Sequence, residues 1–384
     1  MAGFLSFAAL VPTFIDLWSL SNTDAGWING IFYAGYLCAV PVLVSLTDRV
    51  PPRKVYFFSM ALSAASHLAF ALFAEGFWTA MVFRTLAGIG LAGTYMPGLK
   101  LLTDYLYGTE HSRSLAFYTS SFGVGSSMSF VIAGEVSVAY GWAWTFGVAA
   151  AGPALAIVLV MALLPRKDPI PQESPDTHLL DFRPVLRCKP AMAYVLAYTA
   201  HNFELFAFRA WLVAFLAFAH AFDPAGGRYW GVTTLAAAIN LIGVPASIFG
   251  NELAKRYGRH RLIMIAMVAS SVLGCLIGLS VGWPFWMVVG FCLVYAVAIA
   301  GDSAALTAGV VGVAPEGYRG ATMAVHSSIG FAGAFLGPLA VGVALDLAGG
   351  GQSAWSWWIA FAAVGLVVAH GPLAFQALSR RPRR

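Results

Sequence analysis

A short basic cluster occurs twice in the chain, each time between two long apolar segments. Residues 48–54 read Asp-Arg-Val-Pro-Pro-Arg-Lys, and residues 255–261 read Lys-Arg-Tyr-Gly-Arg-His-Arg. The two clusters begin 207 residues apart, and each follows the second apolar segment of its half and precedes the third. A loop that recurs at the same place in two halves predicts one membrane bundle encoded twice, an architecture typical of solute transporters.

The composition places most of the chain in lipid. Of the 384 residues, 59% are hydrophobic and 10% are charged, whereas soluble domains carry about 25% charged residues. Apolar segments of roughly 20 residues are long enough to cross the hydrocarbon layer as helices. Helices are favoured over a membrane barrel, because the segments are continuously apolar and do not alternate with polar residues. The predicted fold class is therefore an all-α membrane protein.

The basic balance, with a pI near 9.0, does not indicate nucleic-acid binding. The basic residues gather in alternate loops, which is a signal of membrane topology, and they form no aromatic-basic patch typical of nucleic-acid surfaces. The four cysteines form no Cys-x-x-Cys pair, and the eight histidines are scattered along the chain. These patterns predict no disulfide framework, no metal site, no cofactor and no catalytic cluster.

Twelve spans are predicted, with a linker after the sixth. They cover residues 3–20, 26–46, 54–74, 77–99, 113–137, 142–164, 190–219, 229–250, 261–281, 284–310, 319–345 and 354–378. Residues 165–189 are rich in proline and charge, so they separate one six-helix bundle (1–164) from another (190–384). The apolar stretch after Met1 is interpreted as a first span and not as a signal peptide, since it lacks a basic leader and a small-residue cleavage site.

The distribution of lysine and arginine predicts the orientation of the spans. Nineteen of the 22 lie in loops or termini on one side, Arg228 lies on the other side, and Arg84 and Arg209 lie inside spans. Loops rich in lysine and arginine stay in the cytoplasm. We therefore expect both termini and the linker to be cytoplasmic, in a multi-pass protein of the inner membrane of a bacterium-like cell.

The internal repeat extends beyond the basic clusters. Val40-Pro41 in the second span matches Val244-Pro245 in the eighth, and the Ser-Ser-Phe-Gly sequence at 120–123 matches Ser-Ser-Ile-Gly at 327–330, again 207 residues later. Six spans followed by six in the same order predict parallel halves related by an axis along the membrane normal. A solute site is expected at the interface of such halves, near the middle of the membrane.

At these positions the chain resembles the major facilitator superfamily, over nearly its whole length. Its 44–54 stretch is similar to the family's loop between spans two and three, with matches at Leu46, Asp48, Arg49, Arg53 and Lys54 and with Val44 and Pro51 in place of two glycines. Span four carries Arg84-x-x-x-Gly88-x-Gly90-x-Ala92, a second family pattern. The resemblance implies twelve helices in two six-helix repeats and a functional monomer. Span five lacks the proline of the drug-exporter pattern, which argues against a drug exporter.

The resemblance also implies a cytoplasmic gating motif. Its residues would form a latch that stabilises the outward-open state, namely Asp48, Arg49, Arg53, Asp104 and Arg113. The second basic cluster contains Lys255, Arg256 and Arg259. It has Lys255 in place of the acid of the motif, and Glu252 could substitute for that acid. The alternative is that these basic loops only fix the topology.

Polar residues inside spans are candidates for the path of the solute and of protons. They are Arg84, His201, Glu204, Arg209, Asn240, Asp302 and His326. A charged side chain in the membrane needs a partner or a wet cavity, so Arg84 either binds an anion, takes part in proton transfer or ties helices together.

Two carboxylates among these residues could carry a proton. His201 and Glu204 share a helix face, and a histidine beside a carboxylate can transfer a proton. The alternative for Glu204 is a tie to an arginine or a tyrosine, and Arg84 lies at a depth at which it could be that partner. Asp302 either takes part in proton coupling or caps local backbone.

The function predicted is secondary active transport of a small organic solute by alternating access, with protons as the coupling ion. No nucleotide-binding loop of the Gly-x-x-x-x-Gly-Lys-Ser/Thr type occurs in the sequence, so ATP is not the direct drive. The alternatives are a proton-driven efflux pump for drugs or metabolites and a non-transporting receptor or scaffold. The partners expected are the solute, protons and the lipid bilayer.

Overall fold

The structure, a computed structural model, is built from helices. It describes residues 1, 3–47, 49–103, 110–164, 181–223 and 230–379, and no strand occurs in these ranges. The first part of the chain forms α1 (Ser6–Ala9), α2 (Val11–Trp18), α3 (Asn22–Leu46), α4 (Pro52–Phe73), α5 (Phe77–Ala92), α6 (Tyr95–Thr103), α7 (Glu110–Tyr140) and α8 (Trp142–Leu163).

The second part forms α9 (Arg183–Arg187), α10 (Lys189–Ala221), α11 (Val232–Leu241), α12 (Gly243–Tyr257), α13 (Arg259–Ile277), η1 (Gly278–Ser280), α14 (Phe285–Ala300), α15 (Ser303–Gly312), α16 (Arg319–Leu347), α17 (Ala354–Val368) and α18 (His370–Ser379). The expected all-α fold class is confirmed for the described residues. The linker differs from the expectation, because α9 forms inside it and α10 already begins at Lys189.

Helices occupy all twelve stretches that the hydropathy pattern marks as spans. Within the described ranges, ten helical stretches are long and apolar enough to cross a membrane. The first predicted span instead consists of α1 and α2, which have 4 and 8 residues, and α5 has 16 residues before the chain turns into α6. The total of twelve membrane crossings therefore stays a prediction.

The break between α14 and α15 is the one that shapes the polar interior. Gly301 and Asp302 interrupt an otherwise apolar run, and a turn at these two residues separates the helices. Asp302 occupies the N-cap position of α15, but its carboxylate makes no capping hydrogen bond there. The side chain is therefore available to a neighbouring helix.

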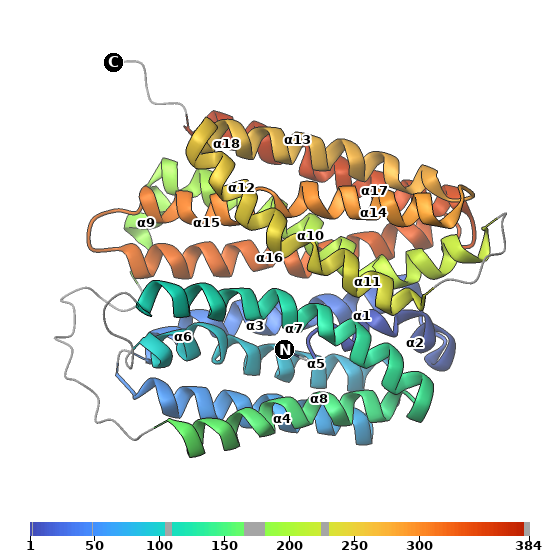
Figure 1. Ribbon diagram of the computed structural model, residues 1–384, viewed down its shortest axis with the longest axis horizontal. Coiled ribbons are helices and arrows are strands. Elements are labelled where there is room, and N and C mark those ends of the chain that lie inside the picture. Colours follow the sequence, from blue (N-terminus) through green and yellow to red (C-terminus); the bar gives the residue numbers. More distant parts are fainter. Residues whose placement is uncertain (2, 48, 104–109, 165–180, 224–229, 380–384) are drawn as a thin grey trace.

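The helices form two layers, each of them a helix bundle, and the layers meet along one plane (Figure 1). In that view α4, α5, α6 and α8 lie below the plane and α12, α13, α14 and α17 lie above it, with α3 and α7 facing α10, α11 and α16 between them. The pairs α3–α16 and α7–α11 join the layers by direct contact, and α10 packs along α16. Segments far apart in the sequence thus lie side by side at the centre.

Glycines bring α3 and α16 into close contact. A Cβ atom on Gly26 would lie 2.8 Å from Pro338 O, and one on Gly30 would lie 2.5 Å from Phe335 O. Small residues at such positions let helix backbones approach in a membrane, where van der Waals packing drives association. The α3–α16 seam is therefore tightly packed in the N-terminal half of α3.

Candidate functional site

A cavity of about 610 Å³ is lined mostly by the second part of the chain, with Tyr95, Phe122 and Gly123 contributed by the first part. Its wall is mostly apolar and comes from α6, α7, α10, α11, α12, α14 and α15. The polar groups on the wall are few, and they are Tyr95, His201, Arg209, Asn240, Ser247, Ser303 and Thr307. An apolar cavity with a few polar groups is the usual form of a site for a small organic molecule.

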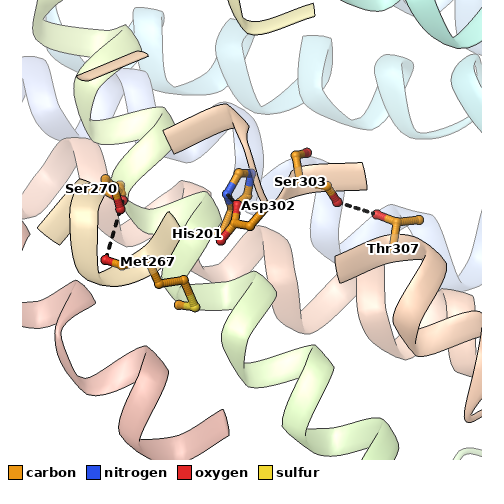
Figure 2. A network of polar contacts seen from close by, with 7 residues as sticks. His201, Met267, Ser270, Asp302, Ser303 and Thr307 are labelled. Atoms are coloured by element: carbon orange, nitrogen blue, oxygen red, sulfur yellow. Dashed lines mark hydrogen bonds and ion pairs between the residues drawn. The ribbon is translucent and has the colours of Figure 1, made fainter. Parts of the chain in front are cut away.

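His201 of α10 pairs with Asp302 at the break between α14 and α15. His201 Nδ1 lies 2.8 Å from Asp302 Oδ1, and both side chains are buried. Figure 2 shows the imidazole beside the carboxylate, next to the start of α15. His201 also lines the cavity, and its Nε2 has no hydrogen-bond partner among the described residues. The two atoms are within ion-pair distance, although Asp302 Oδ1 makes no hydrogen bond to the described residues.

A second histidine lies close to this pair. The rings of His326 and Tyr198 stack with centroids 4.0 Å apart, and Tyr198 also stacks against His201 at 5.8 Å. His326 is 2% exposed, and neither ring nitrogen finds a partner in the part of the chain that the structure describes. His326 does not line the cavity, and it approaches His201 through the ring of Tyr198.

Glu204 is held in a separate tie. Its Oε2 accepts a hydrogen bond of 2.7 Å from Ser270 Oγ, and its Oε1 accepts one of 2.9 Å from Tyr295 OH. Glu204 is 1% exposed and is absent from the cavity wall. The tie to a tyrosine was the alternative reading of the sequence, and it is the one observed. The predicted pairing of Glu204 with Arg84 is wrong, because Glu204 bonds Ser270 and Tyr295. The carboxylate next to His201 belongs to Asp302.

The two arginines inside spans differ in what surrounds them. Arg84 of α5 is 2% exposed, and its guanidinium lies over the ring of Phe32 at 4.4 Å, away from the cavity wall. Arg209 of α10 lies over the ring of Phe206 at 5.5 Å and does line the cavity. A guanidinium over an aromatic face gains a cation–π attraction. Only Arg209 is placed to meet a solute in this cavity.

An aromatic cluster separates the two arginines. Phe32 contacts Tyr33 with ring centroids 5.3 Å apart, and Tyr33 contacts Phe206 at 4.5 Å. Phe331 of α16 joins the same cluster and lies 4.3 Å from the ring of Tyr36. These rings belong to α3, α10 and α16, so the cluster bridges the plane at which the two layers meet.

Asn240 of α11 reaches across that plane to α7. Its Nδ2 donates hydrogen bonds of 3.1 Å and 2.8 Å to the hydroxyls of Ser126 and Ser127. Asn240 is 6% exposed and forms part of the cavity wall. The predicted polar residues thus divide into a set on the wall (His201, Arg209, Asn240) with Asp302 behind it, and a set away from the wall (Arg84, Glu204, His326).

The two layers also join where a carboxylate of α16 binds the N-terminus of α3. Asp346, in the last turn of α16, accepts hydrogen bonds from the backbone N–H groups of Asn22 at 3.1 Å and Thr23 at 2.8 Å. The side-chain amide of Asn22 donates to the same carboxylate at 2.8 Å. The α3–α16 seam is therefore closed at this end of the molecule.

Comparison with models of protein families identifies the family of this chain. Residues 1–244 match the model of the Major Facilitator Superfamily, and residues 155–356 match that of the MFS_1 like family. The first match alone covers more than half of the chain. This chain belongs to the major facilitator superfamily. The resemblance inferred from the basic loop and from the Arg84 pattern is confirmed.

Relatives within the superfamily share modest identity with this member. The chain is 25% identical to protein spinster of Drosophila melanogaster over 255 residues, which are 62% of this chain and 41% of the relative. It is 24% identical to the niacin transporter NiaP of Acinetobacter baylyi over 162 residues, 42% of this chain and 36% of that protein. The matched part spans less than half the length of these relatives.

Solved structures of the superfamily share the fold. A bacterial homolog of the human lysosomal transporter Spinster, in an inward-facing and occupied conformation, aligns with a TM-score of 0.80 at 15% identity, covering 99% of this chain and 94% of that chain. The nucleoside transporter NupG aligns with a TM-score of 0.74 at 13% identity, covering 99% and 98%. At such identities the likeness establishes the fold alone.

The gating motif expected from the superfamily is described only in part. Asp48 and Asp104 lie outside the described residues, as does the side chain of Arg113. Arg49 is exposed. Arg53 donates to the carbonyl oxygens of Leu164 at 3.0 Å and Val160 at 3.4 Å, so it contacts the C-terminal end of α8. The latch therefore stays a prediction.

The second basic cluster makes local contacts. Lys255 Nζ lies 2.6 Å from Glu252 Oε1, three residues earlier in α12, and both side chains are more than half exposed. The guanidinium of Arg256 lies over the ring of Tyr257, and Arg259 starts α13. Glu252 thus pairs with Lys255 within one helix, and a part for Glu252 in a second latch stays a prediction.

Several residues of the site escaped the sequence analysis. Tyr295, Ser270, Ser126 and Ser127 are hydroxyl partners of the predicted groups, and hydroxyls in apolar helices carry little sequence signal because they more often bond their own backbone. Asp346 was missed as well, although a carboxylate in the last turn of an apolar helix is unusual and could have been marked by its unfavourable position at a helix C-terminus.

Proposed function

We propose that this chain is a secondary active transporter that moves a small organic solute through the cavity by alternating access, coupled to protons. The observation that carries the proposal is the His201–Asp302 pair, because a buried acid–histidine pair borders the cavity itself. The two moving units would be the bundles at 1–164 and 190–384, which meet along the plane of Figure 1.

The arrangement of the helices supports a state open toward the cytoplasm. The α3–α16 seam is closed where Asp346 caps α3, at the end remote from the basic clusters. The cavity wall extends along α12 and α15 to Ile248 and Val311, and both helices run toward the end that carries those clusters. If that end is cytoplasmic, as the positive loops predict, the cavity opens inward.

Proton coupling rests on the chemistry of the pair. An imidazole and a carboxylate in contact can hold one proton or two, and the change alters the charge beside the cavity. Burial makes each change in charge energetically large. A transporter that must bind a proton and a solute together needs such a group at the solute site, and His201 with Asp302 meets that requirement.

An anionic solute is supported by Arg209. It is the one guanidinium on the described part of the cavity wall, and its Nε has no partner there. A buried cation without a carboxylate partner favours an anion in the space before it. The relative NiaP is named a niacin transporter, and nicotinate is an organic anion of suitable size, so it is the first solute to test.

The alternatives differ in what they require. A proton-driven efflux pump would use the same cavity and pair in the opposite direction of net transport. A receptor or scaffold has no use for an acid–histidine pair beside a solute-sized cavity. We expect a monomer in the inner membrane that acts without a cofactor and not as an enzyme.

Flux measurements in proteoliposomes test the proposal. The purified full chain is reconstituted, and a pH gradient of either sign is imposed with radiolabelled nicotinate, uridine and a wider panel of organic acids. Gradient-dependent accumulation or depletion of one solute supports the transporter, and its direction separates uptake from efflux. Absence of flux for every solute would support the scaffold, and chemical conversion of a solute would support an enzyme.

A further inference from the structure

Gly250 brings α12 into direct contact with the break that carries Asp302. A Cβ atom at Gly250 would lie 1.9 Å from the carbonyl oxygen of Gly301 and 2.8 Å from its carbonyl carbon. Atoms of these kinds keep about 3.0 Å or more between them in folded proteins. Gly250 is buried, and α12 packs against both α14 and α15. The two backbones can therefore touch here only because residue 250 has no side chain.

Glycine at this position has a local cost that packing must offset. Within a helix, glycine is about 1 kcal/mol less favourable than alanine, and Gly250 is the eighth of the 15 residues of α12. Its backbone does not have the positive φ that would favour glycine. The contact with Gly301 is thus the feature of the structure that calls for glycine at residue 250.

The contact lies one residue away from the carboxylate of the His201–Asp302 pair. Gly301 follows the last residue of α14, and Asp302 is the N-cap residue of α15. Asp302 makes no capping hydrogen bond, and its Oδ1 lies 2.8 Å from His201 Nδ1 (Figure 2). Since no local hydrogen bond fixes the carboxylate, its place follows the backbone of the break, and that backbone rests on α12.

We propose that Gly250 is a positioning residue, whose contact with Gly301 sets where Asp302 stands opposite His201. This inference rests on the proposed function, in which that pair carries the coupling proton. A side chain at position 250 would have to part the two backbones by about 1 Å, from 1.9 Å to 3.0 Å. A displacement of about 1 Å in a functional group is enough to reduce activity roughly a hundredfold.

A metal bridge reports the geometry of the pair without any transport measurement. In the full chain without its native cysteines, Asp302→Cys places a thiol opposite the imidazole of His201, and thiolate and imidazole are good ligands for Zn²⁺. The purified chain in detergent is titrated with Zn²⁺, and the affinity is read from the rise in melting temperature. The cysteine-free chain with Asp302 intact gives the background, and adding His201→Gln to Asp302→Cys should abolish the bridge.

Glycine variants in the Asp302→Cys chain then test the contact. Gly250→Ala should weaken Zn²⁺ binding roughly 10- to 100-fold, the usual effect of disturbing a group that orients a metal ligand. Gly290→Ala is the matched control within α14, because a Cβ atom there meets none of the described residues within 4 Å. Gly301→Ala alters the break itself, but its Cβ atom would lie 3.3 Å from the nearest neighbour, Val297 O, on the same segment. Both of these variants should keep the bridge.

Transport separates positioning from a general loss of packing. With Asp302 intact, Gly250→Ala should lose uphill accumulation of the solute and keep exchange of labelled for unlabelled solute. A general packing defect would lower both rates together. Adding Gly250→Ala to Asp302→Asn should change neither rate further, because two residues that act through one group are not additive.

Equal Zn²⁺ affinity in Gly250→Ala and Gly290→Ala would overturn the positioning role. Absence of any gain in affinity from Asp302→Cys would do the same, because residue 302 would then not be held opposite His201. If Gly250→Ala does not fold, Gly301→Ala decides, since loss of the bridge there would show that the break and not α12 sets the position. The Zn²⁺ results stand whether or not the chain transports a solute, and gradient-driven flux alone decides the proposed function.

Discussion

Asp346 Oδ2 accepts a hydrogen bond of 2.8 Å from the backbone N–H of Thr23, so the last turn of α16 caps the first turn of α3. Helix N-termini leave backbone donors without intrahelical partners. Here Asp346 also takes the N–H of Asn22, while the N–H groups of Ser21 and Asp24 bond the Asp24 carboxylate and the Ser21 hydroxyl. Two backbone N–H groups at the start of α3 are thus satisfied by the Ser21 and Asp24 side chains, and the other two depend on Asp346 of the opposite bundle.

Asp346→Asn should open the α3–α16 seam. The variant replaces one acceptor oxygen by a donor and removes a charge that the helix N-terminus favours, an effect of about 1 kcal/mol. Spin labels at Val138 and Leu347, which are 90% and 85% exposed, would report the separation of the bundles in a cysteine-free background. We expect the fraction of long distances to rise about fivefold.

Asp24→Asn is the matched control, because it changes a carboxylate at the same helix end that bonds only within α3. Its distance distribution should resemble that of the parent chain. If both variants lengthen the distance equally, the seam depends on the helix cap in general and not on the contact from α16.

Arg209 and Arg84 should respond differently to substitution. Arg209→Gln removes the cation from the cavity wall, so the affinity for nicotinate should fall by tenfold or more, as for a charge-assisted hydrogen bond. Arg84→Gln removes a guanidinium that is enclosed by Phe7 and Phe32, so the melting temperature should change and the affinity should not. Titration calorimetry and thermal unfolding measure both quantities, and equal losses of affinity would refute the distinction.

Glu204 should tolerate glutamine and not leucine. In Glu204→Gln the new Nε2 can donate to Ser270 Oγ, whose own hydrogen can go to Met267 O, 3.2 Å away. Tyr295 can still donate to the remaining oxygen, so fold and coupling should be retained. Glu204→Leu leaves the Tyr295 hydroxyl buried without an acceptor, at a cost of about 1–3 kcal/mol.

Thermal unfolding and gradient-driven uptake of the two Glu204 variants provide the check. A lower melting temperature is expected for leucine alone. Loss of uphill transport in Glu204→Gln, with exchange intact, would assign the coupling proton to Glu204 and not to the His201–Asp302 pair.

The sequence was sufficient for the helical class, the superfamily and most span positions, because long apolar runs and basic loops have direct physical causes in the bilayer. The first span was predicted as one helix, and the structure divides it between α1 and α2. Hydropathy measures how apolar a stretch is, but it carries no information on where tertiary packing bends the chain.

The partners of the polar residues were beyond the reach of the sequence. Asp302 was predicted to take part in proton coupling or to cap local backbone, yet its contact with His201 depends on how α10 meets the break after α14. Spacing along one helix suggested Glu204 for His201, since these two share a face. In the structure His201 instead contacts Asp302 of another helix, and Glu204 accepts hydrogen bonds from Ser270 and Tyr295.

The pair of His201 and Asp302 is best tested by comparing uphill transport with exchange in the same proteoliposomes. For the solute that the wild type accumulates under a pH gradient, Asp302→Asn should lose accumulation and keep exchange of labelled for unlabelled solute. Glu75→Gln, which alters an exposed carboxylate, should keep both. Accumulation in Asp302→Asn at the wild-type level would contradict the account, because coupling would then not pass through this carboxylate.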